Sequence, residues 1–133
     1  MSYEAEAATI RAHFEQEWAS FTETTPIAYE NEPFTQPDGP WVRLAIVNAP
    51  AFQADMAPEP RYRHPGTVVV QVFTHDGTGN ATARRLAEQA AGVFRGRTVG
   101  GIVFRAASVL PQGTDGTWYQ VNAQADFFRD STF

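Results

Sequence analysis

The chain lacks both cysteine and lysine. Without cysteine it has no disulfide, no thiolate nucleophile and no cysteine-ligated zinc site. Without lysine it has neither Schiff-base chemistry nor the lysine of a phosphate-binding loop. All ten of its basic residues are arginine, a residue favoured in bidentate ion pairs at interfaces. A GC-rich genome would give the same composition.

The sequence also lacks long apolar runs. No window approaches the roughly 18 consecutive apolar residues of a membrane span, and the charged N-terminal segment does not resemble a secretory signal. We therefore expect a soluble, cytoplasmic protein that contacts no membrane. Because the net charge is −5, the chain has no overall field for neutralising nucleic-acid phosphates. The net charge does not exclude phosphate binding by the local arginine clusters around residues 61–64 and 84–97.

Size and composition predict one domain spanning residues 1–133. A chain of 133 residues buries roughly 68–70% of its unfolded surface, which is enough for an independent core. Hydrophobic residues make up 43% of the chain and aromatic residues 13%, which excludes wholesale disorder.

Two segments have the periodicity of amphipathic helices that dock on a sheet. The first spans about residues 2–20; Ser2 is placed to cap it, and charged residues such as Glu6 fall outside its apolar stripe. The second spans about residues 78–95 and is followed by Gly96, which suits a C-terminal cap. The expected stripes are Tyr3, Ala7, Ile10, Phe14, Trp18 and Phe21 in the first helix, and Leu86, Ala87, Ala90, Val93 and Phe94 in the second.

Other segments alternate between apolar and polar residues as strands do. Residues 41–48 and 67–74 are the clearest, and the largely apolar faces of the first predict a strand at the centre of the sheet. The remaining candidates are residues 27–31, 97–110 and 117–128. Together these segments predict an α+β fold with one mixed, mainly antiparallel sheet of about four to five strands. Two helices pack on that sheet, in the order α-β-β-β-α-β-β.

The last two strands form a long C-terminal hairpin. At about 12 to 14 residues each, they exceed the ordinary strand length of about 5–6 residues and are expected to project beyond the body. Gly100-Gly101 breaks the first strand, and Pro111–Gly116 is the expected turn. One face of the final strand is apolar, and the other carries uncharged polar residues. That polar row is either a solvated face or a contact with another subunit.

A long, crowded loop, residues 49–66, separates the two clearest strands. Its four prolines rule out a regular helix, because each removes an amide donor and restrains the residue before it. Loops of this length are uncommon in compact domains unless they are functional or disordered.

Little in the sequence favours catalysis. The three histidines lie in different elements, so no zinc-ligand spacing occurs, and no serine lies in a nucleophile elbow. The best remaining candidate is His75-Asp76 with the turn Gly77-Thr78-Gly79, which would suit a small-ligand or enzymatic module. This turn lacks both the third glycine of a dinucleotide site and a Gly-Lys-Ser/Thr ending. We expect a non-enzyme with no catalytic residue, metal or cofactor.

Four segments, in their order and spacing, point to a known family. They are NEPFTQPDGPWVRLAI (31–46), RYRHPGTVVVQVFTHDGTG (61–79), VFRGRTVGGIVFRAAS (93–108) and WYQVNAQADF (118–127). Together they resemble the phage tail terminator-like family of small tail-completion proteins of long-tailed phages. The resemblance implies an α+β fold without catalytic residues. It also implies a hexameric ring that caps the tail tube, stops its growth and forms the surface that joins the head.

The same resemblance implies partners. They are further copies of the chain, the tail tube protein and a head-tail connector, with DNA only as cargo passing through the ring. Such a protein assembles in the host cytoplasm and ends in the tail or neck of the virion. A ring of subunits carrying −5 each would be strongly acidic, and acidic lumen side chains would let DNA slide without sticking. A head-tail stopper protein is the alternative within the same class.

The resemblance also turns residues 49–66 into a candidate arm that contacts a neighbouring subunit or the tube. A loop that is mobile in the isolated subunit remains the other interpretation, and the two are compatible if the arm orders on assembly. The candidate apolar anchors are Phe52, Met56 and Tyr62, the cations expected to pair with a neighbour's carboxylates are Arg61 and Arg63, and the polar row of the last strand adds Gln120, Asn122 and Gln124.

Overall fold

The computed structural model describes residues 1–21 and 25–132 and has the expected α+β architecture. In chain order, the elements are α1 (Tyr3–Ala19), β1 (Ile27–Tyr29), β2 (Trp41–Asn48), β3 (Phe52–Gln53), β4 (Tyr62–His75), α2 (Ala81–Phe94), β5 (Thr98–Val99), β6 (Ile102–Asp115) and β7 (Trp118–Ser131). The sheet formed by these described residues has seven strands, whereas the sequence predicted about four to five. Neither helix in the described residues is long and apolar enough to cross a membrane.

The two additional strands are β3, which the sequence missed, and β5, which falls inside the predicted strand 97–110 before its glycine break; each has two residues. A strand is recognised by alternation over at least about four residues, so strands this short leave no periodic signal. β3 pairs with the start of β4, and β5 pairs with the start of β6. Both are products of chain reversals that bring a short segment beside a long strand.

The sheet has the order β1-β2-β4-β7-β6-β5, with β3 also beside β4. β1 and β2 run parallel and all other pairs are antiparallel, so the predicted mixed, mainly antiparallel sheet is confirmed. β4 and β7 form the central pair. β2, which was expected at the centre, lies second from the edge beside the short β1, which pairs only with residues 42–44.

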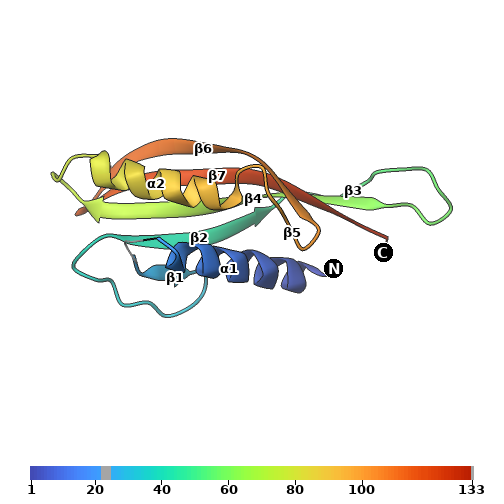
Figure 1. The fold of residues 1–133 in the computed structure, drawn as a ribbon, viewed down its shortest axis with the longest axis horizontal. Coiled ribbons are helices and arrows are strands. Elements are labelled where there is room, and N and C mark those ends of the chain that lie inside the picture. Colours follow the sequence, from blue (N-terminus) through green and yellow to red (C-terminus); the bar gives the residue numbers. More distant parts are fainter. Residues whose placement is uncertain (22–24, 133) are drawn as a thin grey trace.

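Both helices cover one face of the sheet, which curls around them, and the hydrophobic core fills the space between (Figure 1). Along β4, alternate residues from His64 to Thr74 are buried, and the residues between them are only half-buried. The buried set joins the same cluster as the apolar side chains of α1 and α2. No helix of the described chain packs on the opposite face, which we call the uncovered face; its residues include Arg43, Gln71 and Asn122.

Helix α1 begins as predicted but buries a different stripe. Ser2 caps it, because its hydroxyl oxygen accepts a hydrogen bond from the Ala5 amide at 3.1 Å. The buried residues are Glu6, Ile10, Phe14 and Trp18, at a strict spacing of four. The expectation that Tyr3 and Ala7 lie in the core is wrong, since both are exposed. The first buried position of the helix is instead Glu6, whose carboxylate has an ion-pair partner in Arg129.

Helix α2 starts later than predicted, at Ala81, because Gly77 and Gly79 both have positive φ values, 84° and 81°, and form a turn before it. Its predicted stripe is confirmed, with all five residues buried. The helix ends at Phe94, and Gly96 follows in the left-handed conformation with φ of 67°, as expected for a C-terminal cap.

Two glycine turns define the hairpins of the second half. Gly100 and Gly101 have φ values of 56° and 86°, so the predicted break is a two-residue turn between β5 and β6. The second turn lies at residues 116–117, since β6 continues to Asp115 through an irregularity after Pro111. β7 then runs to Ser131, three residues beyond the predicted end at residue 128.

A buried ion pair joins the two ends of the chain. Arg129 Nε donates to Glu6 Oε1 at 2.8 Å, and the two side chains are 2% and 1% exposed. Asn48 Nδ2 donates to the second Glu6 oxygen at 2.9 Å, and Arg129 Nη1 donates to the Met1 carbonyl oxygen at 2.8 Å. The prediction that Glu6 belongs to the polar side of the helix is therefore wrong.

His64 extends this buried polar cluster toward the long loop. Its Nδ1 lies 3.1 Å from the Tyr3 hydroxyl, and its Nε2 lies 2.8 Å from the Ser131 hydroxyl. Burial, together with the positive charge of Arg129, lowers the pKa of His64 below its ordinary value. His64 is consequently neutral in the folded chain at neutral pH.

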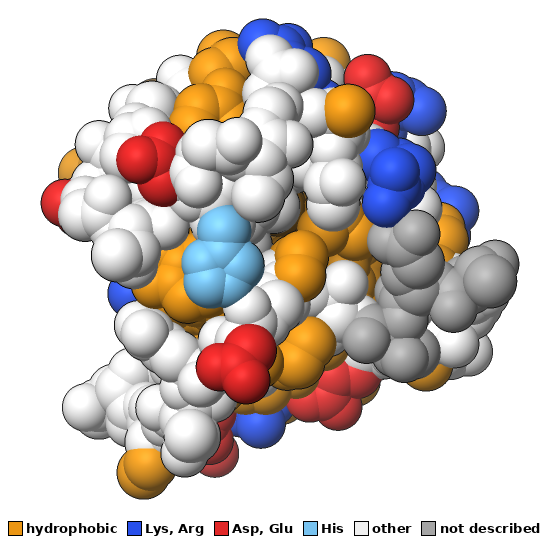
Figure 2. Space-filling view, turned by 90° about the vertical axis from the view of Figure 1, so that its left-hand side faces the viewer, with side chains coloured by type: hydrophobic (Ala, Val, Ile, Leu, Met, Phe, Trp, Pro, Cys, Tyr) orange, Lys and Arg blue, Asp and Glu red, His pale blue; other side chains and the backbone are white. Residues whose placement is uncertain are grey.

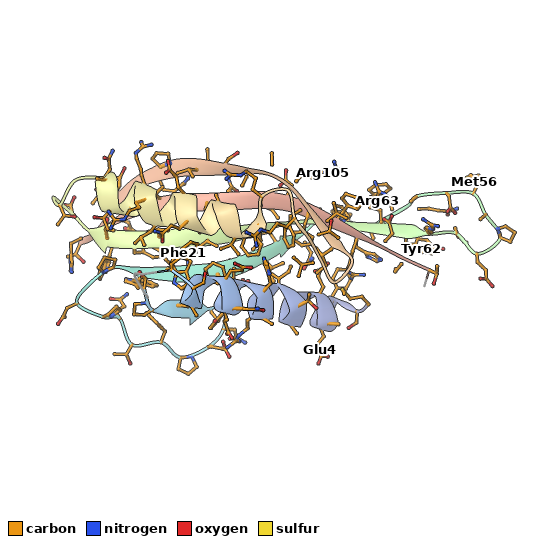
Figure 3. All side chains as sticks on the ribbon, in the orientation of Figure 1. Glu4, Phe21, Met56, Tyr62, Arg63 and Arg105 are labelled. Atoms are coloured by element: carbon orange, nitrogen blue, oxygen red, sulfur yellow. The ribbon has the colours of Figure 1, made fainter. Side chains whose placement is uncertain are left out.

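Removal of the Glu6 carboxylate is expected to destabilise the fold strongly. Glu6→Ala leaves Arg129 as a buried charge without its partner, a change that typically costs about 3–5 kcal/mol. The matched control is Glu4→Ala, because Glu4 lies in the same helical turn and points into solvent (Figure 3); its loss is expected to cost less than about 1 kcal/mol. Urea unfolding followed by tryptophan fluorescence measures both changes, and equal losses would contradict this account of the pair.

Stability is expected to fall as the pH is lowered through the ordinary pKa of histidine, about 6.5. Below that pH the unfolded chain protonates His64, whereas the folded chain resists the proton, so unfolding is favoured. In His64→Gln this contribution is absent. The difference in unfolding free energy between the wild type and the variant should therefore be largest at pH 7.5 and shrink toward pH 5.5. Using the difference cancels His13 and His75, and a difference that does not change with pH would rule the mechanism out.

Candidate functional site: the arm and the uncovered face

Residues 49–66, which we call the arm, form a short hairpin where the sequence predicted a loop. Phe52 and Gln53 pair with Arg63 and Tyr62, so β4 begins five residues before the predicted strand start at Thr67. The prolines exclude a helix, as expected, but they leave these four residues free to pair. The arm extends beyond the rest of the chain at the end opposite the turn that leads into α2 (Figure 1).

The predicted apolar anchors of the arm differ in exposure. Phe52 is 53% exposed and Met56 is 93% exposed, and Met56 lies at the far end of the arm (Figure 3). Tyr62 is half-buried and, two residues before the buried His64, lies on the opposite face of the arm from Arg63. The arm thus carries apolar surface that its own fold does not cover.

The predicted cations of the arm are engaged to different degrees. Arg63 makes a bidentate ion pair with Asp130 of β7, at 2.9 and 3.1 Å, and this pairing lowers the pKa of that carboxyl. A neighbour's carboxylate would therefore have to compete with Asp130 for Arg63. Arg61 has an exposed side chain, and its backbone amide closes the end of the arm.

The sequence reasoning missed an aromatic and basic cluster at the base of the arm. The guanidinium carbons of Arg63 and Arg105 lie 4.1 and 4.7 Å from the ring centroid of Phe128. Alternation along β7 already placed Phe128 on the polar side of that strand, which was the available signal. Its proximity to Arg105 depends on the pairing of β6 with β7, in which Val103 lies opposite Phe128, and no local pattern reveals that register.

The predicted polar row lies on the uncovered face. Gln120, Asn122 and Gln124 are half-buried there, and Gln120 Nε2 donates to Asn122 Oδ1 at 2.8 Å. Asn122 lies opposite Gln71 in the register, and Gln71 accepts a hydrogen bond from Arg43. These amides form an ordered, uncharged surface with spare donors and acceptors.

The alternative site, at His75 and Asp76, lies far from the arm. The His75 ring stacks on Trp118 with centroids 4.5 Å apart and contacts the Asp38 carbonyl oxygen, while Asp76 accepts a hydrogen bond from Thr114. A hollow of about 530 Å³ adjoins Asp76 and the glycine turn. In the described residues, no group of three or more histidine or acidic side chains is placed to hold a metal ion.

Figure 2 looks onto this end of the molecule. It shows a histidine among hydrophobic side chains, with separate acidic side chains around it and basic side chains mainly toward the upper right of the view. Because the carboxylate of Asp76 lines the hollow, an anionic ligand would meet repulsion there. The arrangement of these residues does not indicate a particular ligand or reaction at this end.

Solved structures of other proteins share this fold. One solved structure superposes with a TM-score of 0.74 at 21% identity, covering 100% of this chain and 98% of that chain. Another, from the virion of a native gene transfer agent particle, gives a TM-score of 0.60 at 20% identity, covering 98% and 100%. At these identities the likeness shows the fold alone. No curated protein matches the chain in sequence.

A family model identifies the relationship more directly. The model described as phage tail terminator protein matches residues 6–124, which is most of the chain. The matched range includes the arm, the sheet up to Gln124, helix α2, and helix α1 from Glu6 onward. The chain therefore belongs to the phage tail terminator family of structural proteins of the phage tail.

Proposed function

We propose that six copies of this chain form a hexameric ring that caps the phage tail tube, ends its elongation and presents the surface that joins the head. The family match over residues 6–124 carries this proposal. The role is structural and uses no catalytic residue. Its partners are further copies of the chain, the tail tube protein and a head-tail connector, with DNA as passing cargo.

The shape of the subunit suits such a ring. A closed ring is built from heterologous contacts, so each subunit needs two different surfaces that fit each other. The arm and the uncovered face are two such surfaces, and they differ in character. The arm presents Phe52 and Met56 to solvent, whereas the uncovered face presents the amides of Gln120, Asn122 and Gln124.

Both surfaces present side chains that a protein partner could cover. Three large apolar side chains are exposed on the arm and at the end of β2, with Met56 at 93%, Phe52 at 53% and Val47 at 59%, and covering them with a partner would remove apolar surface from water. The amide row is half-buried and uncharged, so covering it removes no unpaired charge from water. These properties favour a protein partner on each surface.

The net charge of the chain suits the passage of DNA. A ring of subunits at −5 each repels the DNA backbone, so DNA is not held at the wall of the lumen. Ten arginines are present, and several are neutralised within the subunit, as Arg63 is by Asp130 and Arg129 by Glu6. The proposal thus needs no DNA-binding surface.

Truncating the arm anchors should impair capping without unfolding the subunit. Phe52→Ala with Tyr62→Ala is expected to weaken ring formation on tail tubes at least tenfold, since two interface anchors typically carry more than about 1 kcal/mol each. Gln16→Ala is the control, because Gln16 is exposed on α1, outside both the arm and the uncovered face. Electron microscopy of capped tubes and light scattering give the readout. Unchanged capping by the double variant would remove the arm from the mechanism.

Charging the amide row should block assembly without changing side-chain size. Asn122→Asp with Gln124→Glu is expected to abolish rings, because burying the new carboxylates leaves them unpaired. Gln16→Glu makes the same isosteric change on the exposed side of α1 and should assemble normally. Thermal melting verifies that all variants fold. Rings formed by the charged variant at the wild-type concentration would show that the uncovered face is not an interface.

A further inference from the structure

The base of the arm contains a hollow of about 390 Å³ on the uncovered face. Its walls are mainly apolar, and the residues that line it include Ala49, Phe52, Pro65, Phe127 and Phe128. Polar groups at its edge are Arg63, Arg105, Thr67 and Asp126, and the Thr67 hydroxyl donates to the Asp126 carboxylate at 2.8 Å. A hollow of this size and lining has room for an apolar side chain from a partner.

The two arginines at the edge of the hollow are not equivalent. Arg63 is satisfied by its bidentate pair with Asp130. Arg105 stacks on Phe128, but within residues 1–21 and 25–132 its guanidinium has no carboxylate or hydrogen-bond acceptor. Arg105 is therefore the group that can recognise a carboxylate from outside the subunit.

The arm tip, residues 54–61, has the complementary chemistry. The Ala54 amide donates to the Arg61 carbonyl oxygen at 2.7 Å, and the Asp55 carboxylate accepts from the Arg61 amide at 3.1 Å, so the tip is a closed, preorganised loop. It holds Met56 93% exposed and also presents the exposed Glu59, which has no ion pair among the described residues. An apolar group and a free carboxylate thus stand together on one small loop.

We propose that the arm tip of one subunit seats in the hollow at the arm base of the next, with Met56 against the phenylalanine rings and Glu59 toward Arg105. This inference rests on the proposed ring and names the contact that builds it. The thioether of methionine packs favourably on aromatic rings, and a carboxylate supplies the acceptor that Arg105 lacks. A subunit cannot fill its own hollow, because Figure 3 shows Met56 at the far end of the arm and Arg105 beyond its base.

Disulfide trapping tests the contact cleanly, because the chain contains no cysteine. The Met56→Cys variant carries a tag, so that the two chains differ in size on a gel. It is mixed with the Ala49→Cys variant, and the rings that assemble on tail tubes are then oxidised. A mixed disulfide dimer is expected at least fivefold above the control pair of Met56→Cys with Ala12→Cys. Ala12 is the matched control since it is small and exposed like Ala49, and lies on α1, away from the arm and the uncovered face.

A charge reversal provides a second readout that does not depend on cysteine. Glu59→Arg and Arg105→Glu should each weaken ring formation at least threefold, and the double variant should recover most of the loss. Rings that form without the specific disulfide and without charge recovery would overturn this contact while leaving the proposed ring intact. Failure of the wild-type chain to form rings on tubes at all would overturn both.

Discussion

The buried pair of Glu6 and Arg129 is the interaction on which the rest of this structure depends. The two residues lie 123 positions apart, and their contact joins the first turn of α1 to the end of β7. Since neither charge reaches water, each must be satisfied by the other or by nearby polar groups. Asn48 and the Met1 carbonyl complete that set, so one pair positions α1, the end of β2 and the last strand together.

The same pair holds the base of the arm. In the register of β4 and β7, Arg129 lies opposite His64 and Asp130 lies opposite Arg63. Desolvation offsets most of the attraction within a buried pair, and Arg129 Nη2 has no hydrogen-bond partner among the described residues. The pair therefore contributes mainly by fixing the relative positions of the segments that it joins. It fixes the direction in which the arm leaves the sheet, and with it the orientation of the hollow and of the tip.

Prediction from the sequence succeeded where the signal was local and failed where a distant partner decided the outcome. The stripe of α2 and the glycine turns follow from periodicity and backbone preference, and both were found. Glu6 was assigned to solvent because a carboxylate on a helix is buried only when a partner is present, and that partner comes at the other end of the chain. For the candidate site, composition identified Phe52 and Met56 on the arm. The contact of Arg105 with Phe128 was missed because the register between β6 and β7 brings the two residues together.

The sequence by itself determined a cysteine-free and lysine-free α+β chain, its two helices, its long strands, its proline-rich arm and its family resemblance. All of these depend on residue types and spacings within short windows, which local conformational preference and hydrophobic periodicity convert directly into structure. Only the tertiary structure decided that the arm is a hairpin, that Arg63 is already paired and that a hollow lies beneath Phe128. Those features depend on strand register, and register is set by pairing between segments that are far apart in the chain.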